Sequence, residues 1–347
     1  MKRLIILLIL FSFLIFPVCA AEYSAPEAPE SAQPYMPGEN ESFAEGLWYI
    51  IKTAVKKIRP ELANASGICF SVVAMVLVMS VMQTITEISE NIIRLTCAVA
   101  IGILLMSPVN SLIRLGETTI TELSDYGKLL LPVMTAAMAA QGGITASSAI
   151  YTGTVFFNSL LTTLICKFMI PALYIFLCLA IANSAIQQDM LKKAKSFIKW
   201  LMTWVLKIVL YIFTGYISIT GVISGVVDAS ALKAAKLTIA GVVPVVGSIL
   251  SDATETILIS AGVMKTTAGI YGIFAIIAVC IGPFLQIGVQ YILLKISGAV
   301  CNMFGYKPAI CLIEDFSTGM GFVLAMTGTL CILLLISLVC FLRGIGV

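Results

Sequence analysis

The stretch GVISGVVDASALKAAKLTIAGVVPVVGSILSDATETILISAGVMK, residues 221–265, decides how the whole chain is interpreted. It is nearly as apolar as the segments on either side, yet it has a valine-rich turn around Pro244 and Gly247 and several charged side chains. At the depth of a bilayer, an ionisable side chain costs about 2.5–3.5 kcal/mol and usually faces protein or water. Broken backbone is tolerated at that depth only in the same settings. We therefore expect this central segment to be functional. Its charged residues are Asp228, Lys233, Lys236, Asp252, Glu255 and Lys265.

The composition of the chain indicates a membrane protein. Of the 347 residues, 60% are hydrophobic and 11% are charged, whereas a soluble domain is about 45–50% apolar and about 25% charged. The net charge of +3 is small and dispersed along the chain, which argues against a nucleic-acid partner. We predict an all-α, polytopic helical protein whose environment is the lipid bilayer.

The residue types also argue against several kinds of active site. The chain has no histidine, which removes imidazole metal ligands, Ser-His and Cys-His pairs and the commonest general base. The ten cysteines form no CxxC pair, so we interpret them as small buried hydrophobes rather than metal ligands or disulfides. The Walker A, HExxH and G-x-S-x-G motifs are absent. We therefore predict no enzyme activity, no cofactor and no metal.

The N-terminal residues predict three segments before the membrane domain. Residues 1–21 have a positive start, a short apolar run and small residues suited to cleavage, as in a signal peptide. Residues 22–46 are rich in Glu and Pro and lack Lys and Arg, which predicts a disordered, acidic extracytoplasmic tail. Residues 47–62 predict a basic amphipathic helix. Such a helix suits the headgroup region, a partner or the chain's own bundle.

The membrane domain, residues 67–347, contains seven or eight predicted spans. Residues 129–140 are short for a span and decide between the two counts. Only Cys166 and Lys167 separate residues 149–165 from residues 168–185, so we predict a tight helical hairpin there. The other predicted spans are residues 68–85, 95–115, 200–223, 268–293 and 320–341.

Residues 187–199 are the clearest polar loop of the predicted membrane domain. Four lysines make this stretch the best candidate for a cytoplasmic loop, because cytoplasmic loops carry an excess of Lys and Arg. If signal cleavage places the N-terminus outside, the stretch lies inside with eight spans and outside with seven. The lysines therefore favour eight spans. They are Lys192, Lys193, Lys195 and Lys199.

The charges of the central segment allow two interpretations. Asp252 and Glu255 have the D-x-x-E spacing of a capping box at the start of an apolar helix. Asp228 suits the same role at an earlier helix. Alternatively, these carboxylates line a polar path together with Lys233 and Lys236, whose spacing places them on one helical face.

The small residues and the proline of this segment bear on its backbone. Pro244 and Gly247 would link two short helices, either as a re-entrant hairpin like the broken helices of transporters or as an amphipathic hairpin on the membrane surface. Gly221 and Gly225 have the GxxxG spacing that lets membrane helices approach closely.

Several of these residues carry a resemblance to a known family. They are Asp228, Lys236, the Pro-Val-Val-Gly turn at 244–247, Asp252 with Ala253, and the LLPVMTAAMAAQGG sequence within residues 129–143. In these positions the chain resembles the stage III sporulation protein AE family of endospore-forming bacteria. The resemblance covers most of the chain, including the signal peptide, the short N-terminal segment and the polytopic domain.

This resemblance implies a role in the complex that links the mother cell to the engulfed forespore. That assembly is similar to a secretion apparatus and is thought to form a channel needed for late forespore gene expression. The resemblance places the chain in the mother-cell membrane around the forespore, with other stage III sporulation membrane proteins as partners. It implies no catalytic residues.

Three functional hypotheses follow from the sequence. The first is a non-enzymatic subunit of the sporulation channel, whose central segment lines a conduit or contacts other subunits, including further copies of this chain. The second is a self-sufficient secondary transporter that uses Asp228, Lys236 and Asp252 to couple ions to a solute. The third is a scaffold whose acidic tail and basic helix, residues 22–60, recruit partners.

Overall fold

The computed structural model describes residues 26–38, 42–85, 89–140, 144–219, 267–304 and 306–344. These residues are almost entirely helical. In chain order the elements are η1 (Gln33–Tyr35), α2 (Phe43–Lys57), α3 (Arg59–Ile85), α4 (Glu90–Ala140), α5 (Ile144–Leu164), η2 (Ile165–Met169), α6 (Ile170–Ile186), α7 (Asp189–Ile219), α10 (Thr267–Cys301), η3 (Asn302–Phe304) and α11 (Lys307–Gly344).

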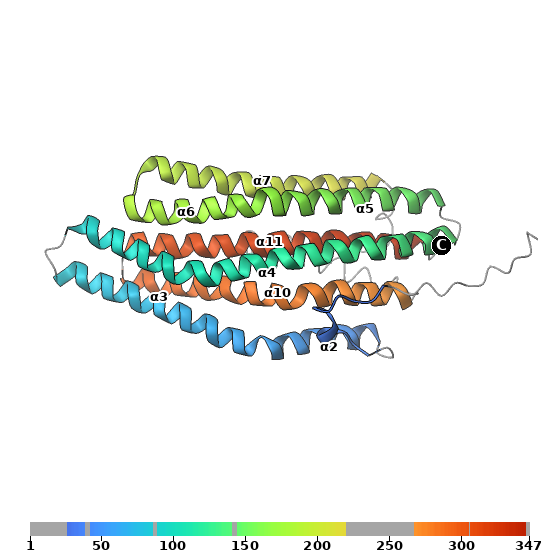
Figure 1. Cartoon of the computed structure of the whole chain (residues 1–347), viewed down its shortest axis with the longest axis horizontal. Helices are drawn as coiled ribbons and strands as arrows, with labels where there is room; N and C mark the ends of the chain where they lie inside the picture. Colours follow the sequence, from blue (N-terminus) through green and yellow to red (C-terminus); the bar gives the residue numbers. More distant parts are fainter. Residues whose placement is uncertain are drawn as a thin grey trace, which may run out of the picture.

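The long helices lie side by side along one axis and alternate in direction (Figure 1). At one end, which we call the loop end, α3 is followed by α4, α6 by α7 and α10 by α11. At the opposite end, which we call the far end, α4 is followed by α5, and this is also where α7 ends and α10 begins. The central helix is α11, which packs against α10, α4, α5 and α6.

Six helical stretches among the described residues are long and apolar enough to cross a membrane. The all-α, polytopic helical class is therefore confirmed. The predicted count of seven or eight spans is therefore wrong for the described residues, because two pairs of predicted spans are each one continuous helix. The six stretches are Arg59–Gln83, Asn91–Ala137, Ser147–Ile186, Asp189–Tyr216, Gly269–Cys301 and Lys307–Leu342.

The first merged pair lies in α4, where residues 95–115 and 129–140 belong to a single 51-residue helix. No proline lies between them, and the Thr119 and Thr121 hydroxyls donate to helix carbonyls one turn earlier, so nothing there ends the helix. Asp125 and Lys128 form an exposed ion pair of 2.8 Å within one turn. A polar stretch between apolar ones thus marks a change of surroundings, not a loop.

The second merged pair overturns the predicted hairpin at Cys166 and Lys167. The helix continues from α5 into α6 through η2, a π-helical turn that contains both residues. A π-helical turn accommodates an extra residue without breaking the helix. The Lys167 side chain lies exposed on the outside of the bundle. The predicted polar loop 187–199 is also shorter than expected, since α7 already begins at Asp189.

The acidic tail is not disordered over the residues that the structure describes. Ala28 and Ala32 are buried, and the Ala28 N–H donates a hydrogen bond of 3.2 Å to the Tyr271 hydroxyl of α10. The Ser31 hydroxyl donates a hydrogen bond of 2.6 Å to Glu122 of α4. Small side chains and backbone groups let this charged segment pack on the bundle, which its composition did not predict.

The amphipathic helix packs on the chain's own bundle through α2. Its N-cap Ser42 and Glu45 form a capping box, which begins the helix at Phe43. Gly46 lies so close to α10 that an added Cβ would be 2.6 Å from the Phe274 ring. After α2 ends at Lys57, Pro60 falls in the first turn of α3, where proline is tolerated. The face of α2 that packs on the bundle is formed by Gly46, Ile50 and Ala54.

Candidate functional site

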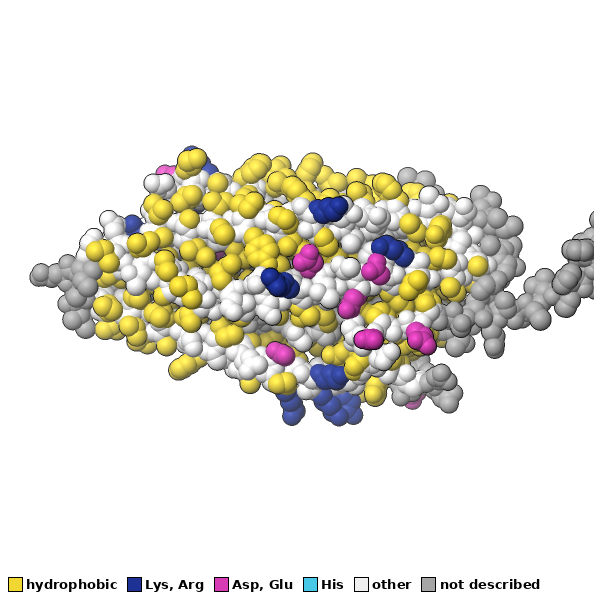
Figure 2. Space-filling model, viewed as in Figure 1, with side chains coloured by type: hydrophobic (Ala, Val, Ile, Leu, Met, Phe, Trp, Pro, Cys, Tyr) yellow, Lys and Arg dark blue, Asp and Glu magenta, His cyan; other side chains and the backbone are white. Residues whose placement is uncertain are grey.

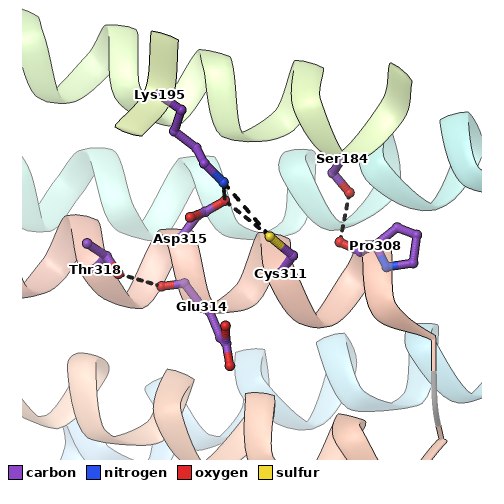
Figure 3. A network of polar contacts seen from close by, with 7 residues as sticks. All are labelled: Ser184, Lys195, Pro308, Cys311, Glu314, Asp315 and Thr318. Carbon is purple, nitrogen blue, oxygen red and sulfur yellow. Dashed lines mark hydrogen bonds and ion pairs between the residues drawn. The ribbon is translucent and has the colours of Figure 1, made fainter. Parts of the chain in front are cut away.

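The candidate site is a buried ion pair that joins α7 to α11 near the loop end (Figure 3). The Lys195 ammonium lies 2.5 Å from the Asp315 carboxylate. The two side chains are only 10% and 14% exposed. The thiol of Cys311, one turn before Asp315, lies 3.8 Å from the Lys195 nitrogen and 3.9 Å from the carboxylate.

The helical period of α7 explains why Lys195 points inward while its neighbours do not. Lys195 falls on the same face as Met202, Leu206, Val209 and Phe213, which are all buried. The other lysines of the cluster point away from this face and are exposed. They are Lys192, Lys193 and Lys199.

Asp315 lies on the buried side of α11, as Lys195 does on α7. It lies between residues that are fully buried in the core, including Leu312, Ile313 and Phe316. The neighbouring Glu314 side chain turns outward and is exposed, while the Thr318 hydroxyl donates to the Glu314 carbonyl at 2.9 Å. One carboxylate of the Glu-Asp pair therefore points toward Lys195 of α7, and the other points away from it (Figure 3).

Further polar contacts tie α6 to its neighbours at the same end. The Ser184 hydroxyl donates to the Pro308 carbonyl of α11 at 2.9 Å. Arg94 of α4 donates to the Ala185 carbonyl at 3.0 Å and to the Gln187 side chain at 3.1 Å. The last carbonyls of a helix lack partners within it, so Arg94 satisfies the C-terminus of α6. Together with the ion pair, these contacts form the loop-end cluster.

The ion pair of this cluster can hold two helices together. Two charges removed from water attract each other strongly. If one partner is removed, the other is left as an uncompensated buried charge, which lowers the stability of the protein by about 3–5 kcal/mol. Charged groups within apolar helices are also common in ion pathways. The ion pair can therefore hold α7 against α11, and a change in either charge would release them.

The residues that the sequence singled out lie elsewhere. All nine fall outside the described residues, namely Gly221, Gly225, Asp228, Lys233, Lys236, Pro244, Gly247, Asp252 and Glu255. The helices that flank them, α7 and α10, end and begin at the far end of the bundle, opposite the loop-end cluster (Figure 1). The central segment and the ion pair are thus attached to opposite ends of α7.

Sequence reasoning missed Lys195 as a buried group because it lies in a lysine cluster. The signal was present in the spacing, since Lys195 is seven residues before Met202 and continues the apolar stripe of α7. Asp315 also carries a signal, because it is a carboxylate within the apolar run of α11 and such groups usually face protein or water.

Comparisons with known proteins agree on one family. The sequence profile of the family described as Stage III sporulation protein AE matches residues 36–343. The chain is also similar to Stage III sporulation protein AE of Bacillus subtilis (strain 168), with 22% identity over 256 residues. This alignment covers 74% of the chain and 63% of the relative, so the chain spans less than two thirds of that protein's length. No solved structure matches the chain.

The profile covers nearly all of the described bundle, including both partners of the ion pair. Its description names a sporulation protein. The chain is therefore a multi-pass helical protein that belongs to the stage III sporulation protein AE family.

Proposed function

We propose that this chain is a non-enzymatic membrane subunit of a channel or secretion-like complex between mother cell and forespore. In this role it acts in the mother-cell membrane that surrounds the forespore and is needed for forespore development after engulfment. Family membership supports the link to sporulation. The packing of the bundle supports the role of a subunit.

The observation that carries this role is the burial of α11. Of its most apolar stretch, 89% is buried within the bundle, and every residue from 319 to 342 except Ile336 is buried. The axis of the described bundle is therefore filled by side chains. A conduit would then form between this chain and other subunits, which include other stage III sporulation membrane proteins and further copies of this chain.

The direction of the helices supports an orientation for this subunit. Three helical crossings, by α3, α4 and α5–α6, separate α2 from the start of α7 (Figure 1). If the signal peptide places α2 outside the cytoplasm, the lysines at the start of α7 lie inside, in agreement with the positive-inside rule. The central segment then begins and ends on the outer side, where Asp228, Lys236 and Asp252 are proposed to line the conduit or contact other subunits.

The test is deletion of the gene in the spore-forming bacterium that encodes it. Growth should remain normal, engulfment should be completed, and heat-resistant spores should be lost until the intact gene is restored. A tagged chain should gather in the membrane around the forespore. Normal spore counts in the deletion strain would refute the proposal.

A secondary transporter is the second candidate, because the Lys195–Asp315 pair is a charged site inside apolar helices. Purified protein in vesicles would then move a solute without partners, and Asp315→Asn would stop the flux while insertion remained intact. Absence of flux, together with failure of the variant to assemble with other sporulation proteins, would favour the subunit.

A further inference from the structure

The bundle is too long for the bilayer that it crosses. The 51 residues of α4 extend about 76 Å at 1.5 Å per residue, whereas the hydrocarbon core of a bilayer is about 30 Å thick. Much of the bundle must therefore lie outside the lipid. We infer that lipid covers only the loop-end half, up to the level of Arg114, Lys167 and Lys207, and that the far half stands in water on the side of α2.

Charged residues on three outer helices mark the same level. Arg114 is 24 residues from the loop-end start of α4, Lys167 is 20 residues before Gln187, and Lys207 is 18 residues after Asp189. At 1.5 Å per residue, these separations correspond to about 36, 30 and 27 Å from the loop end. All three side chains are exposed. This agreement defines a polar boundary about one hydrocarbon thickness from the loop end.

The outward face of α5 and α6 changes character at this boundary. On the loop-end side of Lys167, the exposed residues of this continuous helix are apolar, namely Phe168, Pro171, Ile175, Cys178 and Ile186. On the far side, four of the seven described residues that are exposed carry a hydroxyl group, namely Ser148, Thr152, Ser159 and Thr163. The other three exposed residues are Ala149, Phe156 and Leu160.

The same change occurs along α4. Its exposed residues near the loop end include Ile92, Leu95, Val99 and Ile103. Beyond Arg114 they include Thr118, Thr121, Asp125 and Lys128, followed by the apolar Leu129. Figure 2 shows charged side chains gathered in a band over the middle of α4 and over α2, while the loop-end part of the same face is mostly hydrophobic.

The far halves of α10 and α11 are apolar for a different reason. A helix that is hydrophobic on all sides is buried either in lipid or in protein. Here the neighbours are protein, since residues 319–342 of α11 are enclosed apart from Ile336, and residues 272–280 of α10 are buried. Their hydropathy therefore places no lipid around the far half.

Basic residues also mark the inner boundary of the lipid. Arg94 and Arg114 on α4 are 20 residues apart, or about 30 Å. Lys193 and Lys207 on α7 are about 21 Å apart along the helix. Their long side chains can reach toward the headgroups on opposite sides, so their charged groups lie farther apart than that. Lys199 lies between the two boundaries, and its long, exposed side chain can reach toward the headgroups in the same way.

Two exposed charges on the central helices also fit this inner boundary. Lys295 and Glu314 lie about 10 Å from the loop-end termini of α10 and α11. Their long side chains can reach the headgroups from that depth. The predicted spans 129–140 and 149–165 fall outside the lipid in this placement.

Thiol labelling of the purified full-length chain in lipid nanodiscs, with one chain per disc and the native cysteines replaced, tests this placement. Phe156→Cys and Ile175→Cys are a matched pair on one continuous helix, since the native side chains are 59% and 52% exposed. Asp125→Cys and Ile103→Cys are a second pair on α4. The probe is a hydrophilic maleimide, which reacts with the hydrated thiolate.

Phe156→Cys and Asp125→Cys should react at least about tenfold faster than Ile175→Cys and Ile103→Cys, because a thiol in hydrocarbon does not ionise. All four should react equally after denaturation in SDS. If the Phe156→Cys variant does not fold, Thr152→Cys replaces it. Equal protection of Phe156→Cys and Ile175→Cys in discs, or rapid labelling of Ile103→Cys, would overturn the placement. None of these outcomes depends on the role in sporulation.

Discussion

The helices α7 and α11 are both apolar enough to be predicted spans, yet they have opposite surroundings. Of the most apolar stretch of α7, 22% is buried within the bundle, whereas 89% of the corresponding stretch of α11 is buried. Hydropathy measures how readily a side chain leaves water, but not whether lipid or protein receives it. The difference shows that one long apolar helix can be the core of a membrane protein while another forms part of its surface.

The largest expected effect comes from the ion pair that joins these two helices. Asp315→Ala should lower the free energy of unfolding by about 3–5 kcal/mol, because Lys195 would stay buried without its partner. Unfolding in mixed micelles of mild detergent and SDS measures this loss. The double variant Lys195→Met with Asp315→Leu should recover most of it. If Asp315→Ala is as stable as the native chain, the pair does not join α7 to α11.

A matched pair of glycines tests the packing around α11. A Cβ on Gly116 of α4 would lie 2.6 Å from a methyl group of Val323 of α11, whereas one on Gly215 of α7 would meet no atom within 4 Å. Gly116→Ala should therefore destabilise the bundle by about 1–3 kcal/mol through overpacking.

Gly215→Ala should stabilise the bundle by about 0.5–1 kcal/mol, because alanine is the better helix former. The same unfolding assay compares the two variants. Equal shifts in the same direction would show that α11 is not enclosed more tightly than α7.

A smaller effect is expected from a hydrogen bond inside the core. The Thr154 hydroxyl of α5 donates to the Ser337 hydroxyl of α11 at 3.0 Å, and both residues are buried. Thr154→Val should cost about 0.6 kcal/mol, the average for such bonds between membrane helices. Thr152→Val is the control, since that exposed hydroxyl donates to the Ser148 carbonyl of its own helix. A larger loss for Thr152→Val would contradict the assignment.

The smallest effect on stability is expected on the open face of α7. Trp200 stacks on Trp204 with ring centroids 5.8 Å apart, and both rings are largely exposed. Trp200→Leu should change the free energy of unfolding by less than about 0.5 kcal/mol, as surface substitutions usually do. Phe213→Leu, on the buried face of the same helix, should cost more. A large loss for Trp200→Leu would mean that another part of the chain covers this face.

The sequence predicted well what depends on composition and helical period. Charge content and apolar runs indicated a polytopic helical protein, and the residues of the central segment supported the correct family. Helix ends were predicted poorly. Cys166 and Lys167 suggested a turn, but a π-helical turn continues the helix through them.

The candidate site shows the same division. The spacing of α7 places Lys195 in its apolar stripe, and this could have been read from the sequence. That Lys195 meets Asp315, 120 residues later, could not. The predicted site residues between 221 and 265 lie outside the described residues and remain a hypothesis.

The sequence by itself determined that this chain is a helical membrane protein of the stage III sporulation protein AE family, because composition and motif positions are properties of single residues and their spacing. Only the tertiary structure decided which apolar helix is enclosed, which lysine is buried and where two predicted spans are one helix. Those facts depend on which residues distant in the sequence become neighbours, and a helical period identifies a buried face without naming what covers it.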